Sequence, residues 1–152
     1  MHDKYYAVLD TNVLVSALLG ASHFSNPTKV LKAVTENRII PLYNNEIIEE
    51  YRNVLSRKKF PFSEELIDSV IQTILTDGLS VDRTTAIDEL FPDPKDIVFY
   101  EVSLSKDGSF LVTGNIKHFP QKSFVITPAE MVELQYLVYL YDAALLYTQY
   151  LY

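Results

Sequence analysis

The sequence VLDTNVLVSALL at residues 8–19 contains the end of an apolar run that starts at Tyr5 and stops abruptly at a carboxylate, Asp10. Thr11 and Asn12 are residues that often begin helices, and apolar residues then recur with helical spacing. The pattern predicts a strand, an acid, a turn and a helix. Ligands of parallel α/β sheets bind just outside the carboxyl ends of the strands, so Asp10 is a candidate site residue. The alternative is that Asp10 or Thr11 only caps the helix.

Composition narrows the class of protein. The chain has 152 residues, of which 48% are hydrophobic and 22% charged, which is typical of one globular domain. It has no cysteine, which excludes disulfides and thiolate metal sites. The net charge of −7 argues against a simple DNA- or RNA-binding module, but not against an enzyme whose acids hold divalent cations. No signal-peptide pattern is present, so we expect a cytoplasmic location.

Strand and helix patterns alternate along the rest of the chain. We expect further strands at 39–43, 79–81, 109–113 and 123–126. We expect helices from residue 26 with an apolar face at Val30, Leu31 and Val34, at 45–56, 63–78 and 93–105, and from 128 onward. Asn26 is the expected cap of the second helix, with Pro27 at its first position. Pro41 favours an edge position or an early break for its strand. The alternation predicts an α/β fold with a mostly parallel sheet.

Carboxylates cluster near the predicted strand ends and helix starts. Glu46, Glu49 and Glu50 lie on one helix, where Glu46 and Glu50 share a face because they are four residues apart. Asp93 and Asp96 begin another helix, where capping and the helix dipole explain both acids. For the three glutamates the alternative is an ordinary solvated helix face.

Two other stretches have an unusual composition. Arg57-Lys58-Lys59 is a basic run that either contacts nucleic-acid phosphates or is only a solvated helix end. Residues 134–152 carry seven leucine or valine residues, six tyrosines and a single charged residue, Asp142. The polar residues among them argue against a membrane span, so we expect a helix that packs on this domain or on a second chain, or a disordered extension. We therefore expect one domain at 1–133 with an extension at 134–152.

Four motifs together resemble the PIN domain family, in particular the branch that holds toxin components of bacterial toxin–antitoxin systems. They are LDTNVLVSAL at 9–18, EYRNVL at 50–55, DPKD at 93–96 and FLVTGN at 110–115 followed by KHF at 117–119. The resemblance covers residues 5 to about 133. It implies a three-layer α/β/α fold with a mostly parallel central sheet, and a metal-dependent ribonuclease site at the carboxyl edge of that sheet.

Carried over residue by residue, the resemblance implies a set of acidic ligands. Asp10 is then the central metal ligand, Glu50 the second acid and Asp96 the third, with Asp93 close by. The fourth position is Asn115, where the family often has an aspartate. Thr11, Asn12 and Thr113 then orient ligands or water, although capping explains them equally well. Arg57, Lys58 and Lys59 are the expected contacts to RNA, and His118 is interpreted as a surface loop residue.

Carboxylates without cysteine suit hard cations such as Mg²⁺ or Mn²⁺. Such an ion lowers the pKa of a bound water and stabilises the charge that develops on a phosphodiester. Asn115 keeps a carbonyl oxygen but lacks a charge, so we expect one firmly held ion and a weaker second one that arrives with substrate.

Three functions are consistent with these observations. The first is an endoribonuclease that acts on single-stranded RNA as a toxin, with an antitoxin protein as partner and a possible homo-oligomer. The second is a PIN-like module without activity that binds RNA or a protein, favoured by Asn115 and the acidic charge. The third is a phosphatase of the haloacid dehalogenase type, which is disfavoured because Asn12 stands where that family has its general acid.

Overall fold

Five parallel strands form the centre of the molecule. The computed structural model describes residues 4–86 and 88–151. Ile87, between the predicted strand at 79–81 and the predicted helix at 93–105, lies outside the described residues, as do residues 1–3 and 152 of the predicted domain and extension. The strands are β1 (Tyr5–Leu9), β2 (Ile39–Tyr43), β3 (Leu79–Ser80), β4 (Phe110–Val112) and β5 (Val125–Ile126), in the order β3-β2-β1-β4-β5. All four pairings are parallel, which confirms the predicted fold class.

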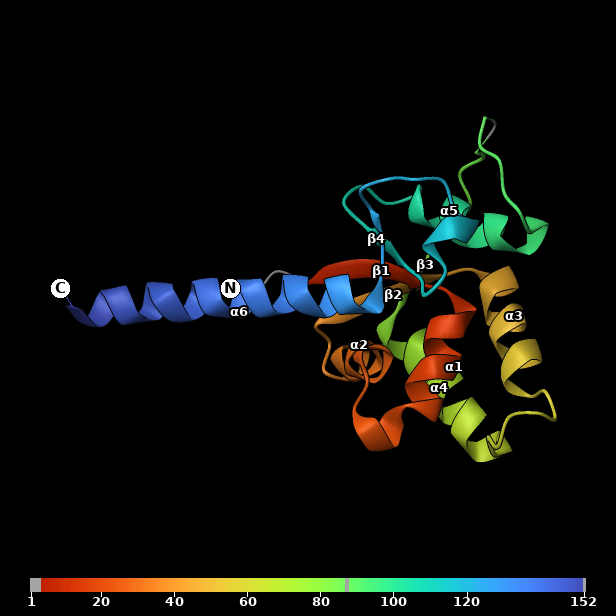
Figure 1. The fold of residues 1–152 in the computed structure, drawn as a ribbon, viewed down its shortest axis with the longest axis horizontal. Helices are drawn as coiled ribbons and strands as arrows, with labels where there is room; N and C mark the ends of the chain where they lie inside the picture. Colours follow the sequence, from red (N-terminus) through yellow and green to blue (C-terminus); the bar gives the residue numbers. More distant parts are fainter. Residues whose placement is uncertain (1–3, 87, 152) are drawn as a thin grey trace.

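Helices flank both faces of this sheet. They are α1 (Thr11–Leu19), α2 (Asn26–Thr35), α3 (Asn45–Leu55), α4 (Glu64–Asp77), α5 (Ile97–Ser103) and α6 (Pro128–Leu151), with 3₁₀ turns at Ala21–His23, Pro94–Asp96 and Ile116–His118. In Figure 1, α1, α2 and α4 lie on one side of the sheet and α5 lies on the other. The three-layer arrangement follows because β1, at the centre, is apolar: Ala7, Val8 and Leu9 are completely buried.

Most helix ends follow the local sequence signals. The side chains of Asn44 and Ser63 accept hydrogen bonds from the backbone N–H groups of Ile47 and Leu66, as expected of caps. Thr127 and Glu130 form the reciprocal capping box at the start of α6. The predicted cap at Asn26 is wrong by one residue. Ser25 is the cap, because its hydroxyl accepts from the Thr28 N–H and leaves Asn26 and Pro27 in the first turn.

The interpretation of Pro41 is also wrong, because β2 is an internal strand that continues to Tyr43. The Tyr5 N–H donates a hydrogen bond to Arg38 O. Because successive residues of a strand direct their backbone groups to opposite neighbours, every second residue from Arg38 onward bonds to β1, and Pro41 is not one of them. The missing N–H of Pro41 therefore faces β3, which begins to pair only at Leu42. No β3 partner stands opposite Pro41, so its missing N–H removes no bond of the ladder.

The helix α6 has two parts with different surroundings. Its first turns contact α2, and Met131 is completely buried. The remainder projects away from the sheet and its flanking helices (Figure 1). No described helix is both long and apolar enough to span a membrane. The division of the chain at residue 133 stays a prediction, since α6 crosses that position without a break.

Candidate active site

The carboxylate of Asp10 is buried at the carboxyl end of the central strand, with 6% of the residue exposed. Asp10 occupies the cap position of α1, yet the structure shows no capping hydrogen bond from its side chain. Its Oδ2 instead accepts a hydrogen bond of 2.7 Å from the Thr113 hydroxyl, at the end of the neighbouring strand β4. Capping of the helix therefore does not explain why an acid is buried here.

Burial raises the pKa of Asp10 from 3.8 to about 6. The hydrogen bond from Thr113 lowers this pKa, the charge of Asp96 raises it, and the Thr11 N–H and His118 lower it by smaller amounts. The net upward shift shows that the fold tolerates the ionised carboxylate at a cost in stability. Such a shift, produced by burial beside a second acid, is typical of functional sites.

The loops that follow β1 and β4 are tied together at this edge of the sheet. The Asn12 side chain accepts a hydrogen bond from the Gly114 N–H at 3.3 Å. The Thr113 hydroxyl oxygen accepts from the Asn115 N–H at 2.9 Å while its own proton is donated to Asp10. Thr113 and Asn12 thus fix the turn at 113–115 beside Asp10, and their expected role in orienting ligands or water stays a prediction.

Asp96 lies at the end of the 3₁₀ turn that leads into α5 and interacts electrostatically with three candidate residues. Burial and the charges of Asp93 and Glu50 raise its pKa, whereas His118 lowers it. The His118 Nδ1 atom is 3.3 Å from Asp96 Oδ2. That contact lacks hydrogen-bond geometry, so this buried oxygen has no hydrogen-bond partner among the described residues. A ligand of this oxygen therefore has to share it with the neighbouring His118.

The structure distinguishes the three glutamates of α3. Glu50 is half-buried and close enough to Asp96 to raise its pKa. Glu46 is exposed and forms an ion pair of 2.8 Å with Arg83, and Glu49 is exposed. Glu50 is thus the glutamate of α3 that faces the other acids.

Two of the remaining candidates lie at the margin of this cluster. Asp93 is exposed, and its side chain accepts a hydrogen bond from the Lys95 N–H at 3.0 Å, as a cap does. Asn115 is also exposed, with its backbone anchored to Thr113. Their positions allow them to contact a ligand from the solvent side.

The basic run does not belong to this cluster. Arg57, Lys58 and Lys59 are exposed in the turn between α3 and α4, beyond the end of α3 opposite to its cap. Any contact of theirs with RNA would be with a part of the strand away from the acids. Their role as RNA contacts stays a prediction.

Sequence reasoning missed two residues of this site. His118 is exposed, as expected of a loop residue, but it also lies against Asp96, which is 22 positions earlier in the sequence. Tyr51 is not among the predicted site residues, yet its hydroxyl donates a 2.5 Å hydrogen bond to Leu9 O, next to Asp10. Burial and the charge of Asp10 raise the pKa of Tyr51, so the phenol stays a donor. The signal in the sequence that points to Tyr51 is its position directly after Glu50.

The family profile of the PIN domain matches residues 6–117, which include these predicted site residues. The chain belongs to the PIN domain family. PIN domains are typically metal-dependent nucleases, and many of them are toxins. Comparisons with curated proteins and with solved structures found no match.

The donor set of this PIN domain suits a hard divalent cation. Asp96 Oδ2 and Thr11 Oγ1 are buried oxygens without hydrogen-bond partners in the described part of the chain. Asp96 belongs to the cluster that it forms with Asp10 and Glu50, and Thr11 directly follows Asp10. A bound cation would relieve the mutual repulsion of these three acids. Within residues 4–86 and 88–151, however, no three acidic or histidine side chains approach closely enough to form a ready ligand set. The acids fit a metal by chemistry, and side-chain rotation has to complete the coordination.

A cavity of about 780 Å³ lies elsewhere, lined by residues that precede β1 and β2 and by parts of α2 and α6. The acid cluster lies at the opposite ends of these strands. We assign the PIN-type chemistry to the acids rather than to the cavity, because buried carboxylates can bind a cation and the lysines and tyrosines of the cavity cannot.

Proposed function

We propose that this PIN domain is a metal-dependent endoribonuclease that cleaves single-stranded RNA as the toxin of a toxin–antitoxin pair. The observation that carries the proposal is the buried carboxylate of Asp10, which makes no capping hydrogen bond to α1 and lies within electrostatic reach of Asp96. A buried carboxylate with a raised pKa lowers the stability of the fold, and such groups are found mainly where they have a function.

In this proposal Asp10, Glu50 and Asp96 hold Mg²⁺ or Mn²⁺, and Asp93 contributes from the solvent side. When bound, such an ion supplies an activated water and stabilises the negative charge that develops on the phosphodiester. Thr113 donates its hydroxyl proton to Oδ2 of Asp10 and thereby fixes the orientation of the carboxylate. Tyr51 fixes the carbonyl of Leu9 and with it the end of β1. Asn12 orders the turn at Asn115 through Gly114.

The test is cleavage of a labelled single-stranded RNA by the full chain with Mn²⁺, Mg²⁺ or a chelator. We expect cleavage with either metal and none with the chelator, and a loss of at least about 100-fold in rate for Asp10→Asn, since several kcal/mol of stabilisation come from the metal. The matched control is Asp107→Asn, at an exposed aspartate in the turn before β4. Unchanged cleavage by Asp10→Asn would refute the proposal.

Two observations favour the alternative of a PIN-like module without activity. The described residues present no ready set of three ligands, and Asn115 takes the place of a family carboxylate. That alternative predicts no cleavage with either metal, together with RNA or antitoxin binding that Asp10→Asn leaves unchanged. Genes beside the coding sequence provide a separate test of the toxin role, because a small upstream reading frame is expected for the antitoxin.

A further inference from the structure

The cavity at the amino ends of β1 and β2 is a groove with a positive charge. Its charged lining residues are Lys4, Lys29, Lys32, Arg38 and one acid, Glu36. Glu36 lies 3.7 Å from Lys32 and 3.1 Å from Arg38, which leaves the other two lysines without that counterion. In a chain of net charge −7, a groove with four cations and one acid is unusual.

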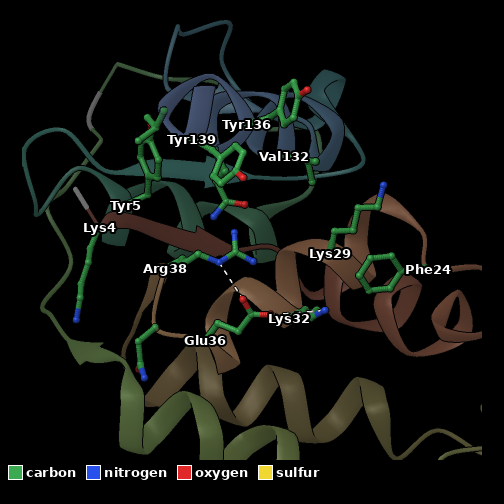
Figure 2. Close-up of a pocket in the computed structure, with 13 residues that line it drawn as sticks. Lys4, Tyr5, Phe24, Lys29, Lys32, Glu36, Arg38, Val132, Tyr136 and Tyr139 are labelled. Carbon is green, nitrogen blue, oxygen red and sulfur yellow. Dashed lines mark hydrogen bonds and ion pairs between the residues drawn. The ribbon is translucent and has the colours of Figure 1, made fainter. Parts of the chain in front are cut away.

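The same groove is rich in aromatic rings. Figure 2 shows Tyr136 and Tyr139 of α6 on one side of it, facing Lys29 and Arg38 on the other. The Lys29 and Lys32 ammonium groups lie 5.7 and 5.1 Å from the centre of the Phe24 ring. The amide nitrogen of Gln135 is buried and has no hydrogen-bond partner among the described residues. The groove is thus built for a ligand that offers aromatic faces and oxygen acceptors.

One face of α6 begins in this groove and continues past the domain. The residues on it follow helical spacing of four and three and are all apolar or aromatic: Val132, Tyr136, Tyr139, Ala143, Leu146 and Tyr150. The first three line the groove, and the last three lie on the projecting part of α6 (Figure 1). Leu146 is 58% exposed and Tyr150 is 89% exposed.

We propose that a second copy of this chain occupies the groove, with the two α6 helices packed antiparallel along this face. The two-fold axis passes beside Ala143, whose small side chain permits the closest approach of the helices. The partner's Tyr150 then lies beside Tyr136, at the edge of the groove. The tyrosine-rich end of each helix thereby meets the cations at the base of the other.

A second copy explains features that a single chain leaves without a function. Exposed apolar side chains occur on several sides of the projecting part of α6, where Leu137, Leu140, Tyr141, Leu145 and Tyr147 are exposed in addition to the face described above. Polar residues are few there: Asp142, Thr148 and Gln149. A helix with apolar residues on several sides is normally buried on more than one of them. In the proposed dimer, the α6 helix of the partner covers one side of this projecting part, and the groove of the partner covers an adjacent side. Tyrosines also supply the ring faces and phenol oxygens that the lysines, Arg38 and Gln135 can bind.

The available area is sufficient for a stable dimer. At roughly 200 Å² for a whole tyrosine side chain, Tyr136, Tyr139 and Tyr150 together expose roughly 400 Å² on each copy. This is about half of the 800 Å² that each partner of a stable interface typically buries. The leucines of α6 and the groove itself supply the remainder.

The first test is the mass of the full chain in solution, measured by sedimentation velocity over a range of concentrations. We expect a species of twice the chain mass of 17.4 kDa. The variant Leu146→Glu/Tyr150→Glu should raise the dissociation constant of the dimer at least tenfold, because it places charges in the apolar interface. Lys29→Glu should also weaken the dimer. The controls are Leu90→Glu, at a 91% exposed leucine in a loop, and Lys58→Glu, in the turn between α3 and α4.

The second test fixes the orientation of the helices, since the natural chain has no cysteine. A single Ala143→Cys variant should be joined efficiently by a short bismaleimide reagent. A single Tyr136→Cys variant should not, because the two copies of residue 136 are separated by about 14 helical residues, or roughly 21 Å. A mixture of Tyr136→Cys and Tyr150→Cys chains should be joined.

The outcomes separate the proposal from its rivals. A monomer at all concentrations would overturn it and assign the groove to another partner. Efficient joining of Tyr136→Cys alone would show a parallel arrangement and overturn the antiparallel one. A dimer that Leu146→Glu/Tyr150→Glu leaves intact would place the interface elsewhere. Circular dichroism of each variant establishes that a loss of dimer is not a loss of fold.

Discussion

The two ends of β1 differ in chemistry and in construction. At its carboxyl end, Asp10 is buried, hydrogen-bonded to Thr113 and within electrostatic reach of Asp96. At its amino end, roughly 16 Å away for a strand of five residues, Lys4 and Tyr5 line an open and positively charged groove. The acidic end is held by hydrogen bonds between strand ends, whereas the basic end is formed where α6 leaves the domain.

This contrast shows that one strand can position two sites with opposite ligands. The acidic end suits a cation and, through it, a phosphodiester. The basic end suits aromatic and oxygen-bearing groups of a second chain. The distance between them lets a dimer form through α6 without covering the acids.

The largest effect on stability should come from removing the charge of Asp10. Its pKa of about 6 in the folded chain exceeds the value of 3.8 expected when unfolded, so the folded state binds the proton more tightly. The folded state is therefore destabilised by ionisation above pH 6, and this penalty fades as the pH falls toward 4. In metal-free buffer at pH 8, Asp10→Asn should raise the free energy of unfolding by up to roughly 3 kcal/mol.

Thermal and urea unfolding between pH 4 and pH 8 measures this effect. The gain should shrink toward zero at pH 4, where the carboxyl of the natural chain is neutral. A loss of stability at pH 8, or a gain that does not depend on pH, would show that Asp10 is a structural acid and that the contrast between the two ends is false.

The second effect concerns the hydrogen bond that holds Asp10. Thr113 is completely buried, so Thr113→Val keeps the shape but removes the donor to the carboxylate. We expect a loss of roughly 2 kcal/mol at pH 8, and an upward shift of the pKa of Asp10. The control is Thr73→Val, at a half-buried threonine of α4 whose hydroxyl donates to Ser69 O of its own helix. Urea unfolding of both variants should separate them, and equal losses would count against a special role for Thr113.

The third effect should appear in activity and separate two neighbouring acids. Glu50→Gln removes a charge that acts on Asp96, and we expect about a tenfold loss of RNA cleavage, equivalent to about 1.4 kcal/mol. Glu49→Gln changes an exposed side chain of the same helix and should leave cleavage within about twofold. If both variants cleave equally well, Glu50 lies outside the site.

The smallest effect is expected at the basic run. Neutralising Arg57, Lys58 and Lys59 to alanine should weaken RNA binding a few-fold and reduce the salt dependence of binding by about one unit of slope per lost contact. The rate of cleavage at saturating RNA should not change. Binding titrations from low to high salt test this, and an unchanged slope would show that the run is only a solvated helix end.

The fold was largely predictable because its signals are local. The strand that stops at Asp10, the caps at Asn44 and Ser63 and the capping box at Thr127 each depend on a few adjacent residues. The errors arose where a tertiary contact decides. Pro41 is tolerated inside the sheet because β3 starts late, and Ser25 replaces Asn26 as the cap at the start of α2.

The acids of the site could be proposed from the sequence, but their partners could not. The contact of His118 with Asp96 and that of Tyr51 with Leu9 join elements that are distant in sequence. The groove was not predictable for the same reason, because residues before β1 and β2, α2 and α6 each supply part of it. Arg83 is exposed and forms ion pairs with the buried Glu101 and with Glu46, and these contacts likewise have no signal in the sequence.

The most direct test of the central claim, that the acidic end of β1 is a metal site, is a calorimetric titration of Mn²⁺ into the full chain and into Asp10→Asn. Binding to the natural chain that is lost in the variant would agree with a metal held by Asp10 and its neighbours. Absence of binding to the natural chain, or equal binding to both, would contradict it.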